Sequence, residues 1–301
     1  MPNWNEILEE LNESKRVDAL DYVRRKYLQL AHEKSGRNVI TYYSSFLQKP
    51  GIEQGFIDDN DKNGFMTVIN KMHRDKGLDL ILHTPGGDIA AAESIVEYLV
   101  EMFDGDIRAI VPQIAMSAGT MIACACKEIV MGLHSSLGPI DPQFGGIPAS
   151  GIIDEFNRAL VEIKENPESI LLWREIISKY HPTFIGECEK AISWANEMVT
   201  KFLENNMLAS DELPHDTAKR IVEHLSKPET VKSHSRHIGV AECESIGLKI
   251  IRLENIMRDV DYQDTILSVH HAYMHTFSNS SSVKIIENHE GVALIQHYQA
   301  M

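Results

Sequence analysis

The sequence predicts an α/β protein built around a mostly parallel sheet. Short apolar runs rich in β-branched residues alternate with longer segments of helical periodicity between residues 38 and 131. This alternation is typical of βαβ units, whose crossovers are right-handed. Gly and Pro interrupt the pattern at junctions such as Pro85-Gly86-Gly87, where the chain is expected to turn sharply. With 301 residues, 43% of them hydrophobic, the chain can also bury a sizeable core.

Each expected element follows from its local pattern. Apolar residues recur at roughly helical spacing up to Leu30, and Ser35-Gly36 ends the pattern, so one or two amphipathic helices are expected within residues 1–36. Farther along, β-branched and aromatic runs predict strands, and amphipathic runs predict helices. The strands are expected at 38–43, 78–83, 107–112 and 128–131, the helices at 65–73, 89–103 and 117–126, and a loop at 48–64.

The second half of the chain is mainly helical. Residues 151–226 have helical periodicity without strand signals, which predicts a helical insertion packed on the sheet. Later elements are expected as a short helix at 240–247, a strand at 248–251, a helix at 261–276 and two strands within 283–295. The expected domains are an N-terminal helical segment at 1–36, a central α/β domain at 37–251 and a C-terminal helix and hairpin-like extension at 252–301.

The net charge and the cysteine content exclude several classes of function. The 29 Lys and Arg residues against 44 Asp and Glu residues give a net charge of −15, which argues against nucleic acid as a partner. The four cysteines form no CxxC pair, so neither a zinc ribbon nor a disulfide framework is indicated. The N-terminal stretch carries charges throughout and contains no signal peptide or membrane span, so a soluble, cytoplasmic protein with no transmembrane segment is expected.

Two strand-to-helix junctions contain residues suited to chemistry. In Leu82-His83-Thr84-Pro85-Gly86-Gly87 the glycines allow a tight turn that exposes backbone N–H groups to an anion, although Gly-Gly also serves as a simple turn. In Ala115-Met-Ser-Ala-Gly119 the pattern approximates G-x-S-x-G, in which small neighbours expose the serine hydroxyl on a sharp turn. Ser117 is therefore a candidate nucleophile, with a helix cap or tight packing as the alternative.

Other polar residues remain open candidates on the residues alone. Asp141 lies before a proline in a constrained loop and could orient a histidine or simply form a turn. His234 and His237 are possible bases among 14 histidines. Residues 59–64 begin like an EF-hand loop, but Asn70 replaces the bidentate glutamate, so an Asx-rich loop that caps the helix from Phe65 is expected. Histidines 270, 271 and 275 do not have the HExxH spacing of a zinc site.

Three blocks in order, HTPGG with AAESI, MSAGTMIA and HSSLGPIDPQFGG, resemble the serine dehydrogenase proteinase family. These are Clp-like serine peptidases, similar in fold to crotonases, and the similarity extends from about Val39 to Ile251. The resemblance implies a Clp/crotonase-like spiral of βαβ units, a homo-oligomer and a triad in the order Ser, Asp, His. Ser117 matches the nucleophile, Asp141 the aspartate and His234 the histidine, with His237 second.

The resemblance implies a serine endopeptidase, a hydrolase that needs no cofactor and no metal and takes a peptide or protein substrate. His234 would take the proton of Ser117 while Asp141 orients the imidazole, and the N–H groups of Gly87 and Ala118 would form the oxyanion hole. Three alternatives remain: a Ser-Lys dyad with Lys164 as base, a crotonase-like acyl-CoA enzyme, and a non-catalytic peptide-binding scaffold.

Overall fold

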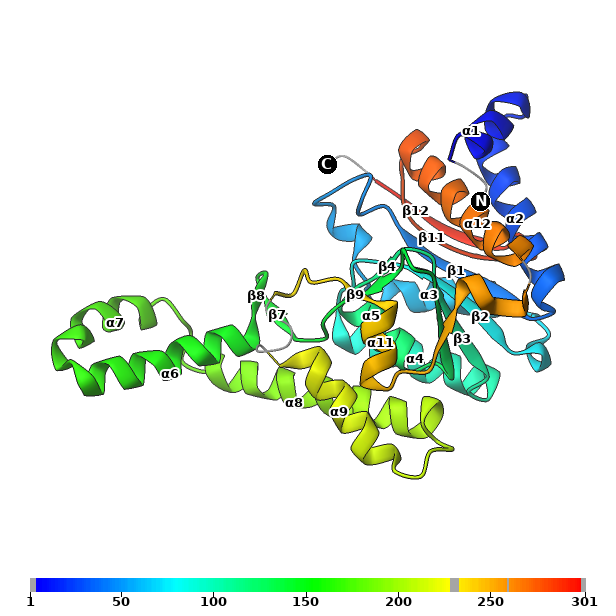
Figure 1. The fold of residues 1–301 in the computed structure, drawn as a ribbon. Helices are drawn as coiled ribbons and strands as arrows, with labels where there is room; N and C mark the ends of the chain where they lie inside the picture. Colours follow the sequence, from blue (N-terminus) through cyan, green and yellow to red (C-terminus); the bar gives the residue numbers. More distant parts are fainter. Residues whose placement is uncertain (1–3, 228–232, 259, 299–301) are drawn as a thin grey trace.

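A seven-stranded sheet forms the centre of the molecule (Figure 1). The computed structural model describes residues 4–227, 233–258 and 260–298. The strand order is β10-β5-β3-β2-β1-β11-β12. The bounds are Asn38–Ser44 (β1), Leu78–His83 (β2), Ile107–Val111 (β3), Glu128–Met131 (β5), Ile250–Arg252 (β10), Ser282–Asn288 (β11) and Ala293–His297 (β12).

The sheet is mostly parallel, as the sequence predicts. β1, β2, β3, β5 and β10 pair in parallel, whereas β11 and β12 add two antiparallel strands beside β1. The antiparallel pair follows from the short turn between β11 and β12, because a two-strand hairpin cannot be parallel. The C-terminal strands therefore extend the same sheet that contains β2, and β11 pairs directly with β1.

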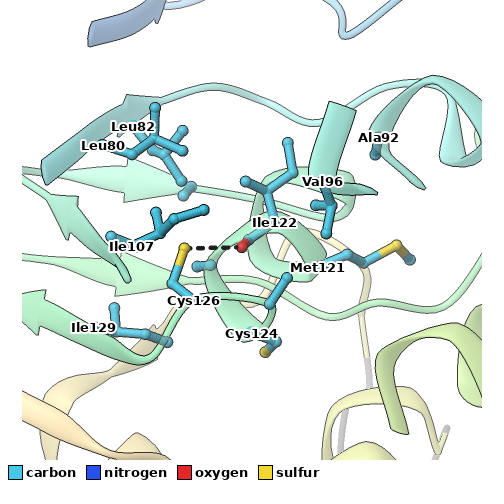
Figure 2. Close-up of a cluster of buried hydrophobic side chains, with 14 of the residues drawn as sticks. Leu80, Leu82, Ala92, Val96, Ile107, Met121, Ile122, Cys124, Cys126 and Ile129 are labelled. Atoms are coloured by element: carbon cyan, nitrogen blue, oxygen red, sulfur yellow. Dashed lines mark hydrogen bonds between the residues drawn. The ribbon is translucent and has the colours of Figure 1, made fainter. Parts of the chain in front are cut away.

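Helices cover both faces of the sheet. One face is covered by α3 (Asn60–Ile69), α4 (Ile89–Phe103) and α5 (Ala118–Cys124), and the other by α2 (Ala19–Ser35) and α12 (Val260–Asn279), with α1 (Trp4–Glu13) packed on α12. Figure 2 shows the first face, where strand residues Leu80, Ile107 and Ile129 share one core with Ile122 of α5 and Val96 of α4. Because side chains alternate along a strand, Leu80 and Leu82 belong to this core and Ile81 to the other.

The helical insertion only partly packs on the core, which corrects the sequence-based expectation. α8 (Phe184–Phe202) and α9 (Pro214–Ser226) contribute buried residues to the main core. In contrast, α6 (Ala149–Glu165) and α7 (Ile170–Ile177) extend away from the sheet as an arm (Figure 1). Three of their apolar residues, Leu160, Leu171 and Leu172, are more than 60% exposed. Helical periodicity reports an apolar face but not whether another element of the same chain covers it.

Very short strands were not predicted. β4 (Ile114–Ala115), β6 (Ser136–Leu137) and β9 (Ile238–Gly239) form a second sheet, and β9 leads directly into α11 (Val240–Ile246). β7 (Gln143–Phe144) and β8 (Ile147–Pro148) form a hairpin. Two residues are too few to show a strand period in sequence. These pieces nevertheless bring residues near 115, 137 and 238 together.

Helix α3 begins at Asn60, five residues earlier than the expected start at Phe65. Asn60, Asp61 and Asn63 are thus part of the helix and not of a loop. Asp58 Oδ1 accepts the Asn60 N–H at 2.8 Å, and Asp61 Oδ2 accepts the Asp58 N–H at 3.0 Å. Side-chain acceptors satisfy amides at this helix start, which explains why a polar stretch is helical here. No helix in the described ranges has both the length and the apolar composition needed to cross a bilayer.

Candidate active site

A cavity of about 410 Å³ lies where β2 ends and α4 and α5 begin. Ser117, Gly87 and His234 all line it. The rest of the lining comes from the loop before α3, the β2–α4 junction and start of α4, the segment that leads into β7, and α8. These residues are Phe56, Pro85, Asp88, Ile89, Ala90, Pro142, Gln143, Phe144, Ala191 and Trp194. The carboxyl ends of parallel strands are the usual location of binding sites in α/β sheets.

Ser117 sits on a sharp turn between β4 and α5. Its backbone has φ 52° and ψ −119°, which is uncommon for a residue with a Cβ atom and carries backbone strain. The turn is held tightly, because Met116 N–H donates to Thr84 O at 3.0 Å and Gly119 N–H donates to Met116 O at 2.8 Å. This is the geometry of a nucleophile elbow, in which the strained turn presents the hydroxyl to the cavity.

Glycine at position 86 allows the two junctions to touch. A Cβ atom on Gly86 would lie 2.7 Å from Met116 O and 3.1 Å from Ala118 N, and Gly86 has φ 96°. Any other residue would push the Ser117 turn away from the end of β2. The Gly-Gly pair is therefore required by a close approach of backbones as well as by the turn itself.

The Gly87 amide is directed by a backbone pairing with Ile57. Ile57 N–H donates to Gly86 O at 2.9 Å, and Asp88 N–H donates to Ile57 O at 2.9 Å. The Gly86 C=O and the Gly87 N–H belong to one trans peptide group and point in opposite directions, so the Gly87 N–H points away from Ile57. Asp88 then caps α4, since its Oδ1 accepts the Ala91 N–H at 2.9 Å.

Ala118 supplies a second amide at this site. It is the first residue of α5, so its N–H is one of the helix-start donors without an intrahelical acceptor. Within the described parts of the chain, neither the Gly87 N–H nor the Ala118 N–H has a hydrogen-bond acceptor. Two such amides near a serine hydroxyl can stabilise an oxyanion.

Asp141 and His234 are joined by a hydrogen bond. His234 Nδ1 and Asp141 Oδ1 are 2.9 Å apart, across 93 residues of sequence. The Asp141 side chain is 5% exposed and that of His234 is 19% exposed. Ile140 N–H donates to Leu225 O at 3.0 Å and Ala149 N–H donates to Pro142 O at 2.8 Å, which fixes the backbone on both sides of Asp141.

The alternative bases lie elsewhere. His237 is exposed, and its Nδ1 is 2.7 Å from Ser136 Oγ. Lys164 is exposed on α6. Neither residue lines the cavity that contains Ser117. The structure thus brings His234, and not His237 or Lys164, to the cavity.

His83 precedes the Gly-rich junction but faces away from the cavity. Its ring lies against Phe46, Tyr43 and His270 on the opposite side of the sheet, with ring centroids 4.8, 5.4 and 5.1 Å away. Burial lowers the pKa of His83 to about 3, so the imidazole is neutral at pH 7. Its position excludes His83 as the base for Ser117.

The aromatic lining was not found from sequence. Phe56, Phe144 and Trp194 come from three separate segments, and Trp194 Nε1–H donates to Glu93 Oε2 at 3.2 Å. No local sequence pattern marks these three residues, and all three are incompletely buried. Together the cavity combines apolar walls, a hydroxyl, an imidazole backed by a carboxylate, and two backbone amides. Such a set can perform acyl transfer through a covalent intermediate.

Comparison with known proteins agrees with this chemistry. Residues 11–262 match the family model of the ClpP-like SDH-type serine proteinases. Two relatives, both uncharacterized proteins of Methanocaldococcus jannaschii, are 31% and 29% identical over 195 residues, or 65% of this chain. The match covers 60% and 59% of the relatives' own lengths, less than two thirds. The family model confirms the resemblance found in the sequence motifs, and the chain belongs to the ClpP-like, SDH-type serine proteinase family.

Proposed function

We propose that this chain is a serine endopeptidase that uses Ser117, His234 and Asp141 as a catalytic triad. The observation that carries the proposal is the 2.9 Å contact between His234 Nδ1 and Asp141 Oδ1, made by a histidine that shares one cavity with Ser117. A carboxylate only accepts hydrogen bonds, so His234 Nδ1 carries the proton and Nε2 is free to act as a base. The family match supports a serine peptidase in general.

The reaction follows from these positions. His234 Nε2 takes the proton from Ser117 Oγ as the oxygen attacks a peptide carbonyl, and Asp141 stabilises the imidazolium that forms. The N–H groups of Gly87 and Ala118 donate to the oxyanion, and each such donor contributes roughly 3 kcal/mol in known enzymes. His234 then returns the proton to the leaving amine, and water hydrolyses the acyl-enzyme by the same route.

The cavity wall suits a peptide. Phe56, Ile89, Phe144 and Trp194 provide apolar surface close to Ser117, while Asp88 is the acidic residue of the lining. Binding sites for small segments are mostly apolar with a few polar groups that set orientation. We therefore expect the enzyme to accept an uncharged, apolar side chain next to the scissile bond.

Two linked measurements test this function. Wild-type protein should be labelled by a fluorophosphonate and should hydrolyse fluorogenic peptides, whereas Ser117→Ala should do neither. His234→Gln should reduce kcat by at least 10³-fold. His237→Gln is the matched control, because His237 belongs to the same segment but bonds to Ser136 outside the cavity, and it should keep near wild-type activity.

Several outcomes would contradict the proposal. Peptide cleavage by Ser117→Ala at the wild-type rate would show that Ser117 is not the nucleophile. Loss of activity in His237→Gln but not in His234→Gln would reassign the base. Binding of CoA thioesters without fluorophosphonate labelling would favour a crotonase-like acyl-CoA enzyme instead.

A further inference from the structure

A buried lysine of the C-terminal hairpin reaches the loop beside the active site. Lys284 of β11 is 0% exposed. Its Nζ donates to Phe56 O at 2.7 Å and to Asp58 Oδ2 at 3.3 Å, and it forms an ion pair with Asp61 Oδ1 at 2.8 Å. The ammonium is thus surrounded by three oxygens of one segment, two through hydrogen bonds and the third through an ion pair. A fully buried lysine is rare unless it is paired in this way.

The Asp61 carboxylate connects Lys284 to two other parts of the chain. Asp61 is 0% exposed and its Oδ2 accepts the Tyr42 hydroxyl at 2.7 Å and the Asp58 N–H at 3.0 Å. Lys284, Tyr42 and Asp61 come from β11, β1 and α3, so three elements of the fold hold residues 56–58. We call this arrangement the Lys284 anchor.

Residues 56–58 in turn hold the Gly87 amide. Ile57 lies between the two residues that contact Lys284, and its N–H and C=O make the hydrogen bonds to Gly86 O and Asp88 N–H, each 2.9 Å. This pairing is an isolated bridge outside the strands. A single bridge has no neighbouring strand hydrogen bonds to keep it in register, so its position depends on what fixes the segment.

We propose that Lys284 is a positioning residue for the oxyanion hole, acting through residues 56–58 on the Gly87 amide. This inference rests on the proposed peptidase function. Lys284 does not touch the cavity, and Phe56 is the residue that both lines the cavity and accepts from Lys284. Lys284 also lies outside residues 11–262, which match the family model. The C-terminal hairpin thus contributes to the geometry of the reaction centre.

The competing explanation is that Lys284 only stabilises the fold, and a second buried cation separates the two. Arg24 is also 0% exposed, and its Nε donates to Glu287 Oε2 at 3.0 Å on the opposite face of β11. Its other partners are Thr276 and Asp21, and it makes no contact with residues 56–58. Arg24→Met therefore removes a buried charge of α2 that pairs with the same strand, and it leaves the Lys284 anchor undisturbed.

The test compares Lys284→Met, Arg24→Met and Lys284→Arg for peptide hydrolysis and for amide hydrogen exchange. The double variant Lys284→Met/Asp61→Asn also removes the carboxylate left unpaired, so that the chain folds even if the single variant does not. We expect kcat to fall roughly 10- to 100-fold with KM within about threefold, because an oxyanion donor acts in the transition state. The Ile57 and Asp88 amides should exchange at least tenfold faster, and Lys284→Arg should recover part of both losses.

Equal losses of kcat in Arg24→Met and in the Lys284 variants, compared at matched stability, would overturn the proposal. Wild-type exchange at Ile57 and Asp88 in the folded double variant would overturn it as well. A failure of the peptidase function has a different signature, since wild type and Ser117→Ala would then not differ in hydrolysis. The exchange rates at Ile57 and Asp88 would in that case still support or reject the anchor by themselves.

Discussion

The backbone at Ser117 predicts that glycine in its place gives a more stable but inactive protein. Ser117 has φ 52° and ψ −119°, a conformation that glycine adopts without steric cost and that other residues adopt only under strain. Ser117→Ala removes the hydroxyl but keeps the Cβ atom and the strain. A comparison of Ser117→Gly with Ser117→Ala thus isolates the backbone term, because both lack Oγ.

The expected magnitude follows from two opposing terms. Strain at a non-glycine residue in such a region costs about 1–3 kcal/mol. Glycine loses more backbone entropy on folding, which costs roughly 0.5–1 kcal/mol relative to alanine. We expect the free energy of unfolding of Ser117→Gly to exceed that of Ser117→Ala by about 1 kcal/mol. This difference in the free energy of unfolding is the cost of placing a residue with a Cβ atom at this turn.

Urea unfolding of both variants under identical conditions measures the difference, with circular dichroism as the readout. Comparable m-values are required, so that the midpoints report stability alone. An independent control is Gly119, which has a negative φ in α5 and should be destabilised by alanine, since its Cβ would lie 2.5 Å from Thr84 Cγ2. Lower stability of Ser117→Gly than of Ser117→Ala would refute the strain argument.

The remaining predictions concern the carboxylate, the Gly-rich junction and acid stability. Asp141→Asn should lower kcat by about 10³- to 10⁴-fold, or about 4–5 kcal/mol, because the neutral amide does not stabilise the imidazolium. The rate of single-turnover acylation measures this effect, and a loss of less than tenfold would contradict the triad. Gly87→Ala should lower the free energy of unfolding by about 2 kcal/mol and remove most of the activity, because the new Cβ atom would lie 2.3 Å from Ile57 N. A urea midpoint equal to that of the wild type would show that this clash does not occur. Burial lowers the pKa of His83 to about 3. Below pH 6.5 this imidazole therefore binds a proton in the unfolded chain but stays neutral in the folded chain. Stability should fall as the pH drops from about 6.5 toward 3, with this one group contributing about 1 kcal/mol between pH 6 and pH 5. His83→Phe should flatten that dependence in urea unfolding, and an unchanged slope would assign it to other groups.

Local patterns predicted the main elements well. The expected strand at 78–83 and helix at 89–103 coincide with β2 and α4, and the strand at 128–131 coincides with β5. Long, strongly apolar runs and clear Gly or Asp boundaries make such elements readable. The early start of α3 and the two-residue strands were missed, because side-chain acceptors and distant partners stabilise them.

The candidate site was likewise predicted only in part from the sequence. Motif order named Ser117, Asp141 and His234, and their roles remain predictions. Motif order also placed His234 ahead of His237, and in the structure these residues, three positions apart, face different partners, Asp141 and Ser136. Apart from the family motif, nothing in the local sequence distinguishes these two histidines.

By itself, the sequence determined the strands and helices of the βαβ units, the sharp turn at Ser117 and the family to which the chain belongs. These depend on side-chain periodicity and on glycine, which act over a few residues. Only the tertiary structure decided which histidine meets Asp141 across 93 residues, and that Lys284 reaches Phe56 across 228. The first contact lies beside the pairing of β6 with β9 in the second sheet, and the other depends on the pairing of β11 with β1 in the main sheet. Local pattern does not contain information about such long-range pairing.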